Sequence, residues 1–175
     1  MNVSDQSPRP CVYWLTGIPG SGKSTIAKDL AKALNSTGKN AFILDGDDLR
    51  NGLNSDLGFD ESDRHENCRR VSEVAKILTE VGLIVIVALV SPYEVDRRKA
   101  RSKFPETNFF EIFVNTPIEI CKERDPKGHY KKAADGEIAN FTGVTHPYEN
   151  PINPDLTISG VGDISLNTKM ILELS

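Results

Sequence analysis

The feature that most constrains this chain is the segment at residues 17–24, which reads Gly-Ile-Pro-Gly-Ser-Gly-Lys-Ser. It matches the pattern G-x-x-x-x-G-K-[ST] and lies between a predicted strand at residues 11–16 and a predicted helix at residues 24–34. Glycines let the backbone N–H groups of such a loop turn inward around phosphate oxygens, and the helix N-terminus that follows favours negative charge. The segment therefore predicts an α/β domain with a phosphate-binding loop, or P-loop.

The side chains of this loop have predicted tasks of their own. Lys23 is expected to reach the β- and γ-phosphates of ATP, and the Ser24 hydroxyl is expected to bind Mg²⁺. An ordinary glycine-rich turn is the alternative, and the strand and helix on either side argue against it. The predicted nucleotide-binding residues of the loop are Gly17, Ile18, Pro19, Gly20, Ser21, Gly22, Lys23, Ser24 and Thr25.

Strands and helices alternate along most of the chain. Strands are predicted at residues 41–44, 83–90 and 109–114, and a long helix is predicted at residues 61–81. The run at 83–90 is continuously apolar, which is typical of a parallel strand covered on both faces. The alternation predicts a three-layer P-loop NTPase fold of the α/β class, with a mainly parallel, doubly wound sheet.

The chain of 175 residues fits one compact domain. We expect a flexible N-terminus at residues 1–10 and a single domain at residues 11–175. Residues 125–154 interrupt the alternation and are rich in Gly, Pro, Lys and Asn. Because so long an irregular segment is usually functional in a compact domain, we expect it to form a lid.

Two tetrapeptides have the form of a helix N-terminus. The sequence S-P-Y-E at residues 91–94 and the sequence T-P-I-E at residues 116–119 each place a hydroxyl residue three positions before a glutamate. In both, proline occupies the expected first helical position. Ser91 and Thr116 are therefore predicted to cap helices.

Aspartates follow the second predicted strand, in the sequence D-G-D-D at residues 45–48. Ligands bind at the carboxyl ends of strands in α/β sheets. We predict that Asp45 lies near magnesium and its waters, and that Asp47 accepts or orients the hydroxyl proton of a phosphoryl acceptor. The alternative is a turn in which Asp47 or Asp48 caps a helix.

Two absences narrow the class of P-loop protein. The strand at residues 83–90 ends without the aspartate that many ATPases use to hold magnesium through water. The strand at residues 109–114 is followed by Asn-Thr-Pro, without a lysine and an aspartate placed to recognise guanine. The sequence therefore favours a kinase domain that acts on a small molecule.

Composition limits the partners and the compartment. A net charge of −4 gives no broad electrostatic reason to expect nucleic acid or an anionic membrane. The three cysteines contain no C-x-x-C pair, which favours free thiols in a reducing compartment, and the three histidines are scattered, so no metal cluster is expected. Residues 1–10 lack an apolar signal-peptide core, and the longest apolar run is too short to span a bilayer. We expect a cytoplasmic protein.

Four arginines gather in the region that follows the aspartates, at positions 50, 64, 69 and 70. The planar fork of arginine suits oxyanions, so an anionic acceptor is plausible for Arg50 and Arg64. For Arg69 and Arg70 we favour surface pairing with nearby acidic residues. Phe59 lies in a polar segment close by, and a second phenylalanine lies in the predicted lid. The two rings are candidates for stacking on a planar ring, although core packing is the commoner role for each.

Taken in order, these motifs resemble the adenylylsulfate kinase family. The resemblance covers residues 11–156. It rests on the motifs D-G-D at 45–47, D-L-G-F at 56–59, D-R at 63–64, S-P-Y at 91–93, R-D-P-K-G at 124–128, F-T-G at 141–143 and P-Y-E at 147–149. Several separate motifs in the same order are more specific than the P-loop alone.

The resemblance implies transfer of a phosphoryl group from ATP to the 3′-hydroxyl of adenosine 5′-phosphosulfate (APS), which gives 3′-phosphoadenosine 5′-phosphosulfate and ADP. It implies that Phe59 and Phe141 enclose the substrate adenine and that Arg124 lies against the ATP adenine. The implied ligands of the APS ribose and phosphosulfate are Arg50, Arg64 and Asn67. Lys127 would add positive charge over the phosphates, and closure of the lid would exclude water.

Ser91 and three lid positions remain open at this stage. The serine that matches Ser91 in the family has been regarded as a phosphoryl acceptor, and the helix cap described above is the alternative that we favour, because direct in-line transfer needs no covalent intermediate. The lid has His129 where the family usually has leucine, Ala134 where arginine is common, and Thr145 where aspartate is usual. These departures bear on lid charge and turnover.

Other functions remain as alternatives. One is a P-loop kinase for another small molecule, such as a sugar acid. Another is a nucleotide-binding regulatory module that has lost turnover. The expected partners are the small-molecule substrate, a separate ATP sulfurylase in the same pathway, and a second copy of the chain in a homodimer.

Overall fold

A computed structural model describes residues 9–175, so residues 1–8 of the predicted flexible N-terminus lie outside the described part. The strands of that part pair in parallel throughout, in the order β2-β3-β1-β4-β5. They are β1 (Val12–Thr16), β2 (Ala41–Asp45), β3 (Ile84–Ala88), β4 (Phe109–Val114) and β5 (Leu156–Ile158). The predicted parallel, doubly wound sheet is confirmed.

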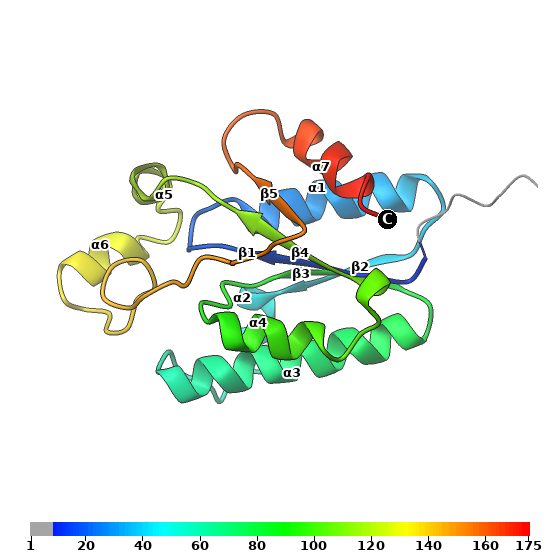
Figure 1. Cartoon of the computed structure of the whole chain (residues 1–175). Coiled ribbons are helices and arrows are strands. Elements are labelled where there is room, and N and C mark those ends of the chain that lie inside the picture. Colours follow the sequence, from blue (N-terminus) through cyan, green and yellow to red (C-terminus); the bar gives the residue numbers. More distant parts are fainter. Residues whose placement is uncertain (1–8) are drawn as a thin grey trace, which may run out of the picture.

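Helices cover both faces of this sheet and give the predicted three layers (Figure 1). One face carries α1 (Lys23–Ser36) and α7 (Ile164–Leu172). The other face carries α3 (Glu61–Glu80) and α4 (Glu94–Arg101). The shorter helices α2 (Gly46–Arg50), α5 (Ile118–Arg124) and α6 (His129–Ala134) follow the carboxyl ends of the strands, and η1 (Glu106–Asn108) is a single 3₁₀ turn before β4.

The core divides into two parts because successive side chains of a strand point to opposite faces. From β1, Tyr13 and Leu15 pack with the apolar residues of α1 and α7. Val12 and Trp14 pack with those of α3 and α4. Since β1 and β3 are buried along their whole length, both read as continuous apolar runs.

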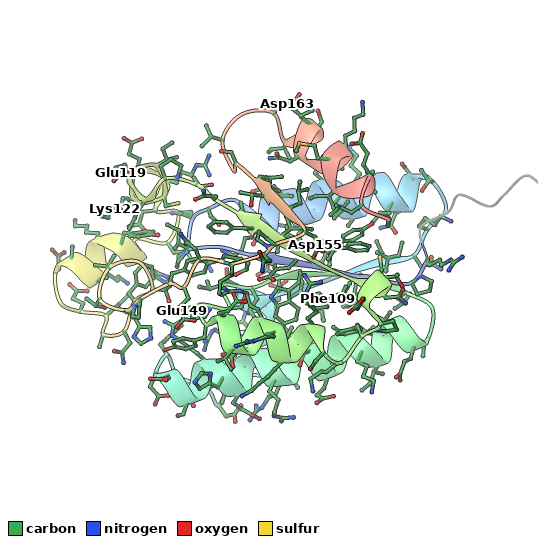
Figure 2. The ribbon with its side chains drawn as sticks, in the orientation of Figure 1. Phe109, Glu119, Lys122, Glu149, Asp155 and Asp163 are labelled. Carbon is green, nitrogen blue, oxygen red and sulfur yellow. The ribbon has the colours of Figure 1, made fainter. Side chains whose placement is uncertain are left out.

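Several short elements were not predicted. The strand β5 has only three residues, and α2 and α6 have five and six, so none is long enough to show a hydrophobic period. Helix α7 begins at Ile164, after the N-cap residue Asp163 (Figure 2). The Asp163 side chain accepts a hydrogen bond from the backbone N–H of Ser165. The predicted lid at residues 125–154 is irregular apart from α6.

The predicted cap at Ser91 is wrong. Helix α4 begins at Glu94, Tyr93 occupies the N-cap position, and no side chain of that position caps the helix. The backbone N–H of Glu94 instead donates to a carboxylate oxygen of Glu149 at 2.7 Å. A partner distant in sequence has therefore replaced the local cap.

The predicted cap at Thr116 is wrong for a similar reason. Helix α5 begins at Ile118 after the N-cap residue Pro117. The buried Thr116 hydroxyl donates to the backbone carbonyl of Ser21 at 2.7 Å and accepts from the backbone N–H of Gly160 at 3.0 Å. The side chain thus joins the P-loop to the segment after β5.

Two further features of the described residues concern membrane-spanning helices and cysteines. No helix among residues 9–175 combines the length and the apolar character that a membrane crossing requires. The three cysteines are free and buried, as expected.

The Thr116 contacts generate a prediction about stability. Thr116→Val keeps the shape of the side chain but removes both hydrogen bonds, and a buried carbonyl and N–H lose their partner. We expect the free energy of unfolding to fall by about 1–3 kcal/mol. Urea unfolding followed by circular dichroism measures the change. Thr107→Val is the matched control, because Thr107 is exposed and bonds only to Asn108. Equal stability of the two variants would contradict the structural role of Thr116.

Candidate active site

A cavity of about 510 Å³ lies at the carboxyl ends of the strands. Segments that are far apart in the sequence form its walls: the P-loop, the β2–α2 connection, α3, the residues after β3 and the base of the lid. The side chains from these segments that carry the argument are Lys23, Ser24, Asp45, Asp47, Arg50, Phe59, Arg64, Asn67, Ser91, Arg124, Lys127 and Phe141. The structure therefore brings the predicted acceptor-binding residues and most of the predicted nucleotide-binding residues to one cavity, whereas Gly17, Ile18 and Ser21 do not line it.

Lys23 is buried within the P-loop. Its ammonium group donates to the carbonyls of Gly17 at 2.8 Å and Ile18 at 2.9 Å, and to the Ser21 hydroxyl at 3.3 Å. Burial lowers the pKa of this ammonium group to about 8. The Lys23 ammonium group is thus held at the loop, and it loses its proton more readily than the ammonium group of an exposed lysine.

Arg124 and Gly160 complete the surroundings of the P-loop. Arg124 donates to the carbonyls of Gly20 at 3.3 Å and Gly160 at 2.7 Å. A Cβ atom at Gly160 would lie 1.8 Å from the carbonyl oxygen of Ser21, so this position requires glycine. Sequence reasoning missed Gly160 because a close approach of two backbone segments leaves no pattern in the sequence.

Asp45 joins the second strand to the P-loop. One of its carboxylate oxygens accepts from the Ser24 hydroxyl at 2.6 Å. The other accepts from the backbone N–H of Asp47 at 2.9 Å, so Asp45 is the N-cap of α2. The alternative interpretation, in which Asp47 or Asp48 caps the helix, is therefore wrong.

The Ser24 and Asp45 oxygens fit magnesium. This cation prefers hard oxygen ligands and usually keeps several waters, with only one or two protein groups and the phosphates of a nucleotide. In the described residues no group of three or more His, Cys, Asp or Glu side chains forms a metal cage. A serine hydroxyl beside one carboxylate is consistent with a nucleotide-dependent magnesium site.

Asp47 faces the lid across the cavity. Its carboxylate lies 2.5 Å from the ammonium group of Lys127, and both side chains are substantially exposed. Exposed ion pairs contribute little to stability, so this contact is a weak link between α2 and the lid. It nevertheless places the lid lysine next to the predicted acid–base group.

Arg50 and Phe59 form one wall of the acceptor half of the cavity. The Arg50 guanidinium lies over the Phe59 ring, 4.2 Å from its centre, and donates to the carbonyls of Leu57 at 3.0 Å and Gly58 at 3.1 Å. The ring itself is 49% exposed. A large aromatic side chain with that much open surface, stacked against a cation at a cavity, is suited to receiving a planar ligand.

Arg64 connects this wall to the lid. It is buried in α3, and its Nε donates to the carbonyl of Phe59 at 2.9 Å. Its Nη2 donates to the carbonyl of Asn140 at 2.6 Å, immediately before Phe141. One guanidinium therefore spans the two segments that carry the predicted stacking phenylalanines.

Phe141 is buried, unlike Phe59. It packs edge-on against the rings of Tyr130, at 4.9 Å between centroids, and His129, at 6.0 Å. Tyr130 in turn donates from its hydroxyl to the carbonyl of Pro19 at 2.7 Å. Phe141 thus belongs to a small apolar cluster at the base of the lid, and it also lines the cavity.

The unusual lid residues have identifiable surroundings. The Thr145 hydroxyl accepts from the backbone N–H of Phe141 at 2.9 Å, so it stabilises the turn that carries this ring. His129 lines the cavity, whereas Ala134 is exposed at the end of α6. Of the three departures, only His129 is in the cavity wall.

The expected surface pairing of Arg69 and Arg70 is present. Both donate to the carboxylate of Glu66, Arg69 at 2.7 Å and Arg70 at 2.9 Å. Arg70 also forms a two-bonded pair with Asp56. Neither arginine lines the cavity.

Ser91 is buried at the edge of the cavity with a left-handed backbone, φ 39°. Its hydroxyl accepts from the indole N–H of Trp14 at 3.1 Å and donates to the Thr16 hydroxyl at 2.9 Å. Its carbonyl accepts from Arg97 at 2.7 Å. The hydroxyl and the backbone carbonyl of Ser91 are therefore both engaged in hydrogen bonds.

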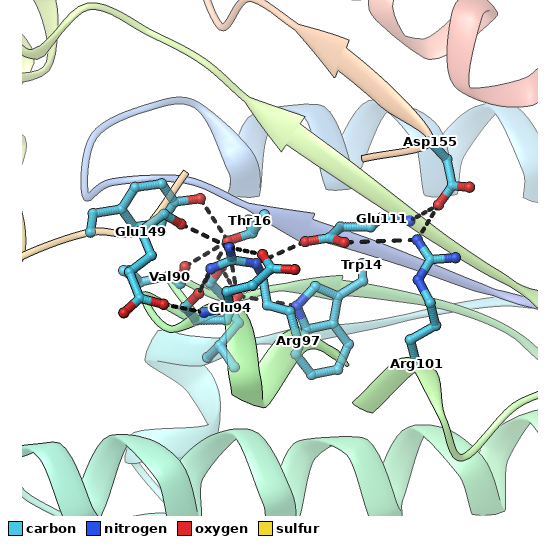
Figure 3. A network of polar contacts seen from close by, with 12 residues as sticks. Trp14, Thr16, Val90, Glu94, Arg97, Arg101, Glu111, Glu149 and Asp155 are labelled. Atoms are coloured by element: carbon cyan, nitrogen blue, oxygen red, sulfur yellow. Dashed lines mark hydrogen bonds and ion pairs between the residues drawn. The ribbon is translucent and has the colours of Figure 1, made fainter. Parts of the chain in front are cut away.

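Arg97 is the centre of this network, and sequence reasoning missed it. The guanidinium is fully buried and forms ion pairs with Glu94 at 2.6 Å and Glu111 at 2.8 Å (Figure 3). It also donates to the carbonyl of Glu149 at 2.8 Å, on the segment that returns from the lid. An arginine in an amphipathic helix gives no sequence signal of burial, because its partners lie on other elements.

The amino-acid sequence of this chain is similar to those of known enzymes. The sequence profile of a family described as adenylylsulphate kinase matches residues 9–159. An adenylyl-sulfate kinase of Marinobacter nauticus is 51% identical over 155 residues, which cover 89% of this chain and 78% of that protein. The bifunctional enzyme NodQ of Rhizobium meliloti is 56% identical over 153 residues, which cover 87% of this chain. The chain spans about a quarter of the length of the NodQ relatives that it matches (24% of this one).

Solved structures of related proteins are also similar to this one. The APS kinase of Mycobacterium tuberculosis, in complex with AMPPNP and APS, superposes with a TM-score of 0.91 at 44% identity, covering 95% of this chain and 98% of that one. A gluconokinase from Sinorhizobium meliloti reaches a TM-score of 0.59 at 16% identity, covering 94% of this chain and 91% of that one, and shows the fold alone.

The burial of Lys23 generates a prediction about pH. The phosphates of a bound nucleotide favour the charged ammonium, whereas the free protein releases this proton near pH 8. Affinity for a non-hydrolysable ATP analogue with Mg²⁺ should therefore hold below pH 8 and fall as the pH rises above it. Calorimetry in buffers of different ionisation enthalpy should show proton uptake on binding above pH 8. Lys23→Met is the control and should bind weakly without this uptake; equal uptake by both proteins would assign it to another group.

Proposed function

The chain belongs to the adenylylsulfate kinase family, and on that premise we propose that it transfers the γ-phosphoryl group of ATP to the 3′-hydroxyl of APS. The products are 3′-phosphoadenosine 5′-phosphosulfate and ADP. One observation carries the proposal: the P-loop residues and the arginine and phenylalanine side chains of the acceptor half line a single cavity. ATP and APS can therefore bind in the same cavity, which direct transfer between them requires.

The P-loop end of the cavity holds the phosphates of ATP. The backbone N–H groups at the start of α1 and the charge of Lys23 face the β- and γ-phosphates. Ser24 and Asp45 would hold magnesium, which would supply positive charge against the negative charge that develops on the phosphates during transfer. Arg124, beside the P-loop, would lie against the adenine of ATP.

Asp47 is placed to interact with the hydroxyl group of the acceptor. It is the second residue of α2, two positions after Asp45, and its exposed side chain lines the cavity. The carboxylate would orient the 3′-hydroxyl and accept its proton as the oxygen attacks the γ-phosphorus in line. Lys127 pairs with this carboxylate, and the incoming hydroxyl would take over that contact.

The acceptor half recognises a planar base and an anion. The exposed ring of Phe59 and the lid ring of Phe141 would enclose the adenine of APS. Arg50 and Arg64 would neutralise the phosphosulfate, and Asn67 would bond to the ribose or the phosphosulfate. Since Arg64 bonds to both ring-bearing segments, substrate binding and lid position are linked at this residue.

Ser91 is a structural residue in this proposal. Its hydroxyl lies between the Trp14 indole and the Thr16 hydroxyl, so phosphorylation would break two buried hydrogen bonds and bring charge into the core. Direct transfer from ATP to APS avoids both changes. We therefore favour direct transfer over a mechanism with a phosphoserine intermediate.

The setting of the reaction is also proposed. Three free, buried thiols favour a cytoplasmic location. APS would come from a separate ATP sulfurylase. Self-association into a homodimer is a further proposal, and sedimentation velocity of the purified protein tests it.

The activity has a direct test with a matched control. The native protein, Mg-ATP and APS should yield ADP and the 3′-phosphorylated product. Asp47→Ala should lower kcat by about a hundredfold or more, the usual magnitude for a lost acid–base group. Asp48→Ala is the control, because Asp48 is the next residue of the same helix and is exposed outside the cavity.

The outcomes separate the alternatives. No product from the native protein, with ATP still bound, would exclude an active APS kinase and leave another small-molecule acceptor or a regulatory role. Product from the native protein and undiminished product from Asp47→Ala would preserve the activity but remove the proposed role of Asp47.

Ser91→Ala tests the phosphoserine intermediate. We expect turnover within about tenfold of native, because no chemical step passes through the hydroxyl. We also expect the free energy of unfolding to fall by about 1–3 kcal/mol, because the Trp14 indole N–H loses its acceptor. Product assays and urea unfolding measure the two effects. Complete loss of turnover in a folded variant, together with a phosphorylated native protein in mass spectra, would establish the intermediate.

A further inference from the structure

A pair of side-chain amides lies behind the acceptor half of the cavity. Asn54 is fully buried in the turn between α2 and α3, and its Nδ2 donates to the Oδ1 of Asn67 at 2.6 Å. Asn67 is 6% exposed and lines the cavity, whereas Asn54 does not. A ligand can therefore touch Asn67, and Asn54 can act on that ligand only through Asn67.

The turn that carries Asn54 is tightly held. The backbone N–H of Asn54 donates to the carbonyl of Leu49 at 2.8 Å, and its own carbonyl accepts from Leu57 at 3.1 Å. The carbonyl of the preceding Leu53 accepts from Arg70 at 3.0 Å. These contacts fix the backbone on both sides, so the Asn54 amide has a defined position against α3.

The direction of the amide–amide bond sets what Asn67 presents. An asparagine side chain has one oxygen that accepts and one NH₂ group that donates. Because the Oδ1 of Asn67 is occupied by Asn54, Asn67 keeps its N–H donors for the cavity. Arg50 and Arg64, on the same side of the cavity, are also donors and cannot accept. This wall is therefore matched to ligand atoms that accept hydrogen bonds.

We propose that Asn54 is a positioning residue: it orients the Asn67 amide with its NH₂ group toward the ligand and so makes this wall selective for hydrogen-bond acceptors. The matching ligand atoms are the oxygens of a phosphosulfate, the ring oxygen of a ribose or a ring nitrogen of the base. The identity of the ligand as APS rests on the proposed function. The orientation of the amide does not, because it is a property of the protein without substrate.

Hydrogen exchange of the side-chain NH₂ groups tests the orientation without any substrate. In the native protein labelled with ¹⁵N, the Asn54 NH₂ signal should exchange slowly, since it is buried and bonded, and the Asn67 signal should exchange faster. Asn54→Ala and Asn67→Ala each remove one signal and so assign it. A protected Asn67 signal would mean that the Asn67 NH₂ group is the bonded one, and it would overturn the proposal whatever the exchange rate of the fully buried Asn54 NH₂ group.

A double-mutant cycle tests the consequence for binding. Asn67→Ala should raise the KM for APS about tenfold or more, which corresponds to one hydrogen bond to a charged or polar ligand. Asn54→Ala should raise it by a similar factor, and the double variant should be no worse than Asn67→Ala alone, because Asn54 acts through Asn67. The KM for ATP should change by less than about threefold in all three variants, since the sequence places Asn54 and Asn67 outside the P-loop and their side chains bond to each other.

Further variants separate positioning from general damage. Asn54→Asp preserves size but cannot donate, so it should raise the KM for APS as Asn54→Ala does. Asn51→Ala, in the same turn but exposed, should leave both KM values native. Additive effects in the cycle, or a native KM for APS in Asn54→Ala, would overturn the proposal. If the native protein does not phosphorylate APS, the proposed function fails, and the exchange experiment still decides the orientation of Asn67.

Discussion

The parallel pairing of β1 with both β3 and β4 determines where each functional segment lies. Parallel strands direct their carboxyl ends to one edge of the sheet, so the connections that follow β1, β2, β3 and β4 emerge side by side. These connections are the P-loop, the Asp45–Asp47 turn, the Ser91 segment and the Thr116 segment. Polar side chains then join them: Ser24 with Asp45, and Thr116 with the P-loop. The site is therefore a product of strand order, secured by a few buried hydrogen bonds.

Much of the fold follows from local sequence, and the exceptions have a common physical cause. The central strands were predictable because each is a continuous apolar run, and the long helices α1 and α3 were predictable because each repeats apolar residues at helical spacing over enough residues. The caps expected at Ser91 and Thr116 were wrong because a hydroxyl that has both a local and a distant partner bonds to whichever one the packed chain brings into line. Sequence spacing describes only the local partner.

The residues of the candidate site also differ in how far they could be predicted from the sequence. The P-loop, Asp45 and Asp47 were predictable because contiguous residues carry their chemistry. Arg50, Phe59 and Arg64 were already candidates from their residue types and their place in the sequence, and the resemblance to a family gave each of them a specific task. Asn54 and Arg97 were not predictable by either route, because each acts through partners that the fold, and not the sequence, places beside it.

The buried Arg97 network also limits how this protein can diverge. Four segments meet at one guanidinium: the Ser91 connection, the start of α4, the strand β4 and the segment that returns from the lid. Loss of any one partner leaves a buried charge incompletely paired, which is far more damaging than loss of an exposed ion pair. Substitution of Glu94 or Glu111, whose carboxylates pair with Arg97, therefore requires a compensating change at Arg97. Evolutionary drift at these three positions is expected to be correlated, and a lid grafted from a relative is expected to function only if its returning segment keeps the backbone carbonyl of position 149 beside Arg97.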